Sequence, residues 1–60
     1  MPSISVELFK GRTIEQRRAF VAAVTQAAVD HLDARQEGVR IRLIEMDRED
    51  VARNGRLLSD

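Results

Sequence analysis

The sequence predicts an α/β fold: a single βαβ unit with parallel strands and a C-terminal hairpin, assembled as an oligomer. Three observations predict it. Apolar and polar residues alternate near the start of the chain and again after residue 38, and an amphipathic stretch with helical spacing lies between. The chain also has only 60 residues and no cysteine. A chain this short buries only about 60% of the surface that its unfolded form exposes, so association is the expected remedy.

The first expected strand runs from Ser3 to Phe9. Within it Ile4, Val6 and Leu8 point to one face, and the residues between them point to the other. This period of two is that of a β-strand.

The expected helix extends from about Ile14 to about Leu32. A short connection, residues 10–12, precedes it, and Thr13 with Gln16 three residues later has the spacing of a capping box. His31 is expected to pack in the apolar stripe and to interact with the helix C-terminus. The stripe comprises Ile14, Val21, Val24, Ala28 and Leu32, widened by Phe20 and Ala27.

The second expected strand, Val39 to Met46, completes a βαβ unit with parallel strands and a right-handed crossover. The following acidic segment, Asp47 to Asp50, is interpreted as a solvated loop. The Asn54-Gly55 pair favours a tight turn, so the last ten residues are expected to form a small hairpin.

One helix covers one face of a two-stranded sheet and leaves the other face open. That open face carries Phe9, Ile44 and Met46, so we expect it to pack against another subunit. A neighbour's strand or hairpin is expected to cover the sheet edge. Function is therefore to be sought in the assembled particle.

Composition excludes several functional classes. Ten basic and ten acidic side chains balance, which argues against nucleic acid as a partner. Cysteine is absent and His31 is the single histidine, so neither a disulfide nor a His/Cys metal site is expected. No apolar run is long enough to cross a membrane and no signal peptide is visible, so we expect a soluble, cytoplasmic protein.

Pro2 has the most distinctive chemistry, because removal of Met1 would leave a secondary amine at the start of the chain. A free α-amino group has a pKa of about 7.7–8.0, and an apolar pocket or a nearby arginine lowers that pKa towards neutrality. Such an amine can take up a proton at pH 7 and return it elsewhere. Taken alone, Pro2 is more simply an ordinary proline.

Two arginines are placed where they could bind a substrate. Arg12 lies in the strand-to-helix connection and Arg40 near the start of the second strand, and each has a planar fork suited to a carboxylate or enolate oxygen. Arg42, on the same strand face as Arg40, is open to an intersubunit ion pair or a site role. Solvated or salt-bridged surface charges are expected for Arg17, Arg18, Arg35, Arg48 and Arg56.

In combination these features resemble the 4-oxalocrotonate tautomerase family. The shared features are the N-terminal Pro2, the Gly11-Arg12-Thr13 turn followed by Glu15-Gln16, and a strand that opens with Val39-Arg40 and closes with Glu45-Met46. They are in register without a gap over about three-quarters of the chain. The resemblance implies that residues 1–60 form a single tautomerase domain.

The resemblance also implies a cofactor-independent isomerase that moves a proton along a conjugated 2-hydroxy or 2-oxo unsaturated carboxylic acid, as met in aromatic compound catabolism. Pro2 would be the general base. Arg12 would bind the distal carboxylate, and Arg40 would hold the 2-oxo or 2-hydroxy oxygen and its neighbouring carboxylate. The family member is a hexamer, a trimer of dimers, whose sites combine several subunits.

The length of the first strand independently favours a shared site. Seven strand residues at about 3.3 Å each separate Pro2 from Arg12 by more than about 20 Å. One six-carbon diacid cannot touch both, so Arg12 must come from a neighbour if both act on it. Arg40 could be local by parallel pairing, although the family draws it from an adjacent subunit.

The chain departs from the family after its second strand. Val51 stands where the family has an aromatic wall residue, and Arg53 adds a charge where the family has a Gly-rich hairpin. Both changes are expected to alter the substrate while leaving the proton-transfer residues in place.

Two alternatives remain open. A relative that hydrates or dehalogenates an unsaturated acid would use a protonated Pro2 as its acid, with Asp50 or Glu49 activating water. An inactive subunit of a mixed hexamer would show no turnover by itself.

Overall fold

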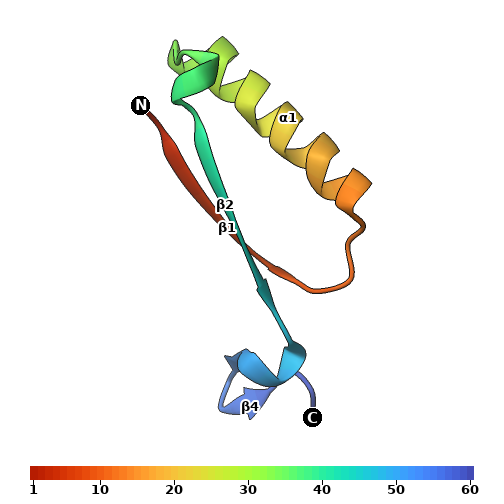
Figure 1. Ribbon diagram of the computed structural model, residues 1–60. Helices are drawn as coiled ribbons and strands as arrows, with labels where there is room; N and C mark the ends of the chain where they lie inside the picture. Colours follow the sequence, from red (N-terminus) through yellow and green to blue (C-terminus); the bar gives the residue numbers. More distant parts are fainter.

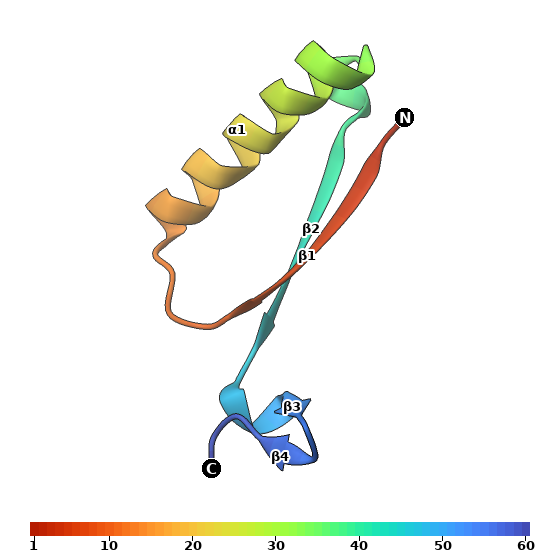
Figure 2. The same cartoon turned by 180° about the vertical axis from the view of Figure 1, so that it is seen from behind.

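A two-stranded parallel sheet carries one long helix on a single face (Figures 1 and 2). The computed structural model describes all residues, 1–60. Strand β1 (Ser3–Phe9) pairs with β2 (Arg40–Met46), and helix α1 (Ile14–Leu32) connects them. The chain then forms a small antiparallel hairpin of β3 (Ala52–Arg53) and β4 (Arg56–Leu57). The expected βαβ unit with its C-terminal hairpin is confirmed.

The second strand begins one residue later than expected. The N–H of Val39 donates to the carbonyl of Gln36, at 3.3 Å, and so closes the short 3-10 helix η1 (Gln36–Gly38). The N–H of Arg40 is the first to reach β1, where it donates to the carbonyl of Pro2 at 3.0 Å. The local turn therefore takes Val39 out of the ladder.

The start of α1 is fixed by the expected capping box. The side-chain oxygen of Thr13 accepts a hydrogen bond from the N–H of Gln16 at 3.1 Å, and the Gln16 side chain accepts from the N–H of Thr13 at 2.8 Å. These two bonds satisfy N–H groups that have no partner inside the helix. The helix ends at Asp33, whose φ of 58° is left-handed.

The apolar stripe of α1 is covered only in its middle. Ala28, 4% exposed, is the single buried residue of the chain, and Val21 and Val24 beside it are half-buried. The ends and margin of the expected stripe stay open: Ile14 is 48%, Phe20 42% and Leu32 65% exposed. A 19-residue helix is about 28 Å long, whereas seven-residue strands span about 23 Å, so the helix overhangs the sheet.

Two residues of the expected stripe on α1 lie outside the covered surface. Ala27, expected to widen the stripe, and His31, expected to pack within it, are both exposed. Both follow from the narrow sheet, which covers the helix at Ala28 and leaves the margin of the stripe and the last turn uncovered.

The C-terminal hairpin has the expected tight turn. Asn54 and Gly55 have φ values of 55° and 78°, the left-handed backbone that a two-residue hairpin loop requires. The preceding segment, expected as a solvated loop, instead contains the 3-10 helix η2 (Arg48–Asp50). Asp47 caps this helix, and its N–H donates to the Asp50 carboxylate at 3.2 Å.

The opposite face of the sheet has no second layer over it, as both views show (Figures 1 and 2). Phe9, Ile44 and Met46 on that face are half-buried. With one buried residue among 60, the chain forms no core of its own. No helix combines the length and apolar character needed to cross a membrane.

Candidate functional site

The residues predicted to carry the chemistry lie at two ends of the sheet. Arg40 is next to Pro2, because its N–H bonds to the Pro2 carbonyl and its neighbour across the ladder is Ser3. Arg12 lies beyond the other end of β1, and Figure 1 shows the N-terminus and the β1–α1 connection at opposite ends of that strand. A single chain thus brings Pro2 and Arg40 together and holds Arg12 apart.

Pro2 is half-buried at the amino end of the ladder. While Met1 is attached, the Pro2 nitrogen is an amide and offers no basic lone pair. The Met1 residue is 92% exposed, so its removal costs the fold little packing. Processing would therefore turn an inert position into a secondary amine beside the Arg40 backbone.

Arg12 is held in a tight connection. Gly11 has a φ of +121°, which side-chain-bearing residues rarely adopt, so glycine suits this turn. The Nη1 group of Arg12 donates to the carbonyl of Phe9 at 3.0 Å. A guanidinium has five N–H donors, so most of the Arg12 fork remains open to a carboxylate.

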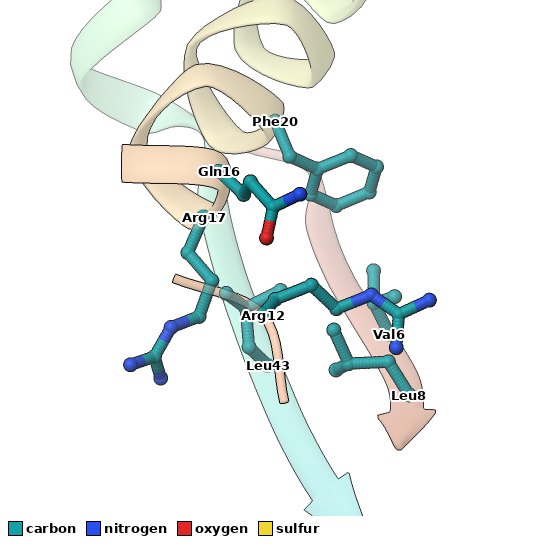
Figure 3. Close-up of a pocket in the computed structure, with 7 residues that line it drawn as sticks. All are labelled: Val6, Leu8, Arg12, Gln16, Arg17, Phe20 and Leu43. Atoms are coloured by element: carbon teal, nitrogen blue, oxygen red, sulfur yellow. The ribbon is translucent and has the colours of Figure 1, made fainter. Parts of the chain in front are cut away.

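A pocket of about 360 Å³ lies between the first turns of α1 and the sheet (Figure 3). Its volume is within the range of small-molecule sites, roughly 300–1,000 Å³. Its lining is an apolar floor edged by two guanidinium groups, which point in opposite directions in Figure 3. The lining residues are Val6, Leu8, Arg12, Gln16, Arg17, Phe20 and Leu43.

Arg17 is the pocket residue that sequence reasoning missed. It forms an ion pair with Glu45 of β2, at 3.3 Å, which confirms the expected surface ion pair but not its place at a pocket. Its spacing from Val21 and Val24 puts it on the inner face of α1. This helical spacing was the signal in the sequence that could have placed Arg17 at the pocket.

Val51 and Arg53 belong to the hairpin region, beyond the carboxyl ends of the strands and away from Pro2 (Figure 1). Val51 is half-buried, and its carbonyl accepts from the N–H of Leu58 at 2.9 Å. Arg53 is exposed and lies across the hairpin from Arg56. Any contact between Val51 and a Pro2 amine must therefore join two subunits.

The remaining candidates stay apart from these groups. Arg42 is exposed, lies across from Ser5, and has no ion pair within the chain. Glu49 and Asp50 lie in η2, at the hairpin end of the molecule. Neither carboxylate is near Pro2 of the same chain.

Comparison with known proteins identifies the family of this chain. The family model described as tautomerase enzyme matches residues 2–60. The chain belongs to the tautomerase family. A relative from Bacillus subtilis, 2-hydroxymuconate tautomerase, is 37% identical over 60 residues, which are 100% of this chain and 97% of the relative.

Solved tautomerase structures have the same fold. The structure of YwhB, a homologue of 4-oxalocrotonate tautomerase, has a TM-score of 0.93 at 36% identity, covering 98% of this chain and 97% of that one. A 4-oxalocrotonate tautomerase isozyme from Methylibium petroleiphilum has a TM-score of 0.90 at 41% identity, covering 97% and 91%. The chain is thus an isomerase, a keto–enol tautomerase related to 4-oxalocrotonate tautomerase.

A more distant likeness extends to the fold alone. A heterohexameric 4-oxalocrotonate tautomerase from Chloroflexus aurantiacus is 22% identical, with a TM-score of 0.89 over 100% of this chain and 97% of that one.

Proposed function

We propose that residues 1–60 act as a single tautomerase domain on conjugated 2-hydroxy or 2-oxo unsaturated carboxylic acids, without a cofactor and with Pro2 as general base. The main support for the proposal is the placement of the candidate residues. Pro2 and Arg40 lie at one end of β1, and Arg12 lies with its pocket at the other end. The proposal includes a cytoplasmic location and a place in aromatic compound catabolism, both expectations from the sequence.

The proposed reaction moves one proton. After Met1 is removed, the neutral Pro2 amine takes a proton from the carbon beside the carbonyl of a 2-oxo acid, or from the hydroxyl of a 2-hydroxy acid such as 2-hydroxymuconate, and either route gives the same dienolate. The protonated Pro2 then returns the proton to a carbon of the conjugated chain, where a new C–H bond forms and the 2-oxo group is left. No oxidant or second substrate is needed.

Two arginines stabilise the charge in this scheme. Arg40 holds the 2-oxo oxygen and its neighbouring carboxylate, where negative charge develops. Arg12 binds the distal carboxylate and draws electron density along the conjugated chain. Preorganised donors at a developing oxyanion are usually the largest catalytic contribution.

We propose a hexamer, a trimer of dimers, as the active particle. A chain with one buried residue and two strands leaves apolar surface open on both faces. A diacid that touches Pro2 and Arg12 must also bridge two chains, because both ends of β1 cannot meet in one. A folded monomer in sedimentation at micromolar concentration would contradict this assembly.

The activity is tested on protein shown by mass to lack Met1. Such protein should convert 2-hydroxymuconate, followed by its ultraviolet absorbance, whereas protein that retains Met1 should be inactive. Because Pro2 must be neutral to act as a base, kcat/KM should rise with pH and level off above the amine pKa. A rate that instead falls over that range would favour the hydratase-like alternative, in which Pro2 is the acid.

A mixed particle is the other outcome to separate. The heterohexamer from Chloroflexus aurantiacus is such a particle. If the processed chain turns over no enol acid alone, addition of a sister chain from the same source should generate activity under the inactive-subunit hypothesis. Activity of the chain alone excludes that hypothesis.

A further inference from the structure

The connection that carries Arg12 is tied to two consecutive residues of β2. On its amino side, the N–H of Lys10 donates to the carbonyl of Met46 at 3.0 Å. On its carboxyl side, the guanidinium of Arg17 pairs with the carboxylate of Glu45 at 3.3 Å. The last two residues of β2 therefore anchor both ends of the segment.

Arg17 is coupled directly to the residue that follows Arg12. The N–H of Arg17 donates to the carbonyl of Thr13 at 3.1 Å, and Thr13 caps the helix. Fixing the Arg17 side chain on β2 thus fixes the cap, and with it the backbone from which Arg12 projects. The two arginines also line the same pocket (Figure 3).

Apolar packing holds this end of α1 weakly. Ile14 and Phe20, which flank Arg17, are 48% and 42% exposed. The Arg17–Glu45 pair is the one side-chain hydrogen bond between α1 and the sheet, and its side chains are only 33% and 32% exposed. A cation near a helix N-terminus gains nothing from the helix dipole. The ion pair with Glu45 on β2 therefore accounts for the position of the Arg17 side chain.

We propose that Arg17, through Glu45, is a positioning residue that sets where Arg12 meets the distal carboxylate of a diacid substrate. The proposal rests on the proposed role of Arg12 above. It predicts a selective effect: loss of the pair should weaken the grip on a second carboxylate and leave the proton transfer at Pro2 unchanged. Substrates with a single carboxylate should therefore be insensitive to it.

The test compares two substrates in variants of each member of the ion pair and in a matched control. Arg17→Met keeps an unbranched apolar stem but removes the fork, and Glu45→Gln removes the partner charge. For 2-hydroxymuconate each should raise KM about three- to fivefold, the size expected of a partly exposed pair. For a 2-hydroxydienoate with one carboxylate, kcat and KM should both stay within about twofold of the values for the unchanged protein. The matched control Arg18→Met, one residue along and without an ion pair, should change neither.

Charge exchange distinguishes positioning from general stability. The double variant Arg17→Glu/Glu45→Arg should restore the diacid KM, and the Glu on the helix N-terminal turn suits the dipole. Thermal unfolding and sedimentation of every variant should show an intact particle. Equal losses on both substrates, or no recovery on exchange, would overturn the proposal.

Arg12→Ala separates this inference from the function on which it rests. If Arg12→Ala raises the diacid KM but Arg17→Met does not, the positioning role is wrong and the function stands. If Arg12→Ala itself does not discriminate between the substrates, both fail together.

Discussion

At the amino ends of β1 and β2, one backbone hydrogen bond, from Arg40 to Pro2, joins the candidate groups, and neither side chain has a hydrogen-bonding partner within the chain. At the carboxyl ends the contacts are dense. Lys10 pairs with Asp47 at 3.2 Å, and the Arg48 guanidinium lies 4.8 Å from the centre of the Phe9 ring. The Arg12 fork and the Arg17–Glu45 pair add to them.

The difference indicates how each half of the site is made. The carboxyl end is built by contacts within one chain, so Arg12 is largely in place before any partner arrives. The amino end lacks such contacts, and Met1 blocks the Pro2 nitrogen. Under the proposed function, this end becomes active only through processing and through neighbouring subunits of the hexamer.

The largest expected effect tests the amino end. Pro2→Ala keeps an N-terminal amine after processing but makes it primary and less constrained. We expect kcat to fall by about 10²-fold, the lower end of the range for general acid–base catalysis, because an amine remains but its position and proton affinity change, while sedimentation stays unchanged. Mass spectrometry must first show that Met1 is absent from both proteins. Unchanged turnover would rule out Pro2 as the base.

The next effect concerns the charge that develops beside Pro2. Arg40→Ala removes the fork that we propose faces the 2-oxo oxygen, so kcat should fall by ~10²-fold, as for loss of one oxyanion donor. KM should change less. Because the Arg40 backbone still bonds to the Pro2 carbonyl, β2 should begin at the same residue. Mono- and diacids should be affected alike.

A smaller, substrate-dependent effect is expected at the carboxyl end. Arg12→Ala removes the proposed charge-assisted contact to the distal carboxylate, so KM for a diacid should rise about tenfold and its kcat should fall. A monoacid lacks that contact and should be less sensitive. If Arg12→Ala and Arg40→Ala gave the same pattern on both substrates, the two roles would be misassigned.

The sequence predicts most of the fold because the relevant signals are local. Alternation defines β1, the Thr13 and Gln16 spacing defines the start of α1, and Asn54-Gly55 defines the hairpin turn. The covered width of α1 was not predictable in the same way. It depends on how far two short strands extend beneath a longer helix.

The sequence predicted the candidate site residues better than the contacts that hold them in place. The rise per strand residue already places Pro2 and Arg12 at opposite ends of β1. The Arg17–Glu45 pair joins residues 28 apart in sequence, so it depends on the parallel register and on how α1 crosses the sheet. Such a contact has no local pattern.

The smallest expected effect concerns the hairpin, where Val51 stands in place of the aromatic wall residue that the family resemblance implies. Val51 is half-buried after η2, and its carbonyl accepts a hydrogen bond from the N–H of Leu58, a backbone bond that does not depend on the side chain at position 51. Val51→Phe should raise kcat/KM for 2-hydroxymuconate by about two- to tenfold, because an aromatic face adds contact with the planar dienol. Val51→Leu, which adds volume without a ring, is the matched control and should give little gain. Equal gains from both would assign the effect to pocket volume instead of aromatic contact. No gain from either would place Val51 outside the substrate pocket.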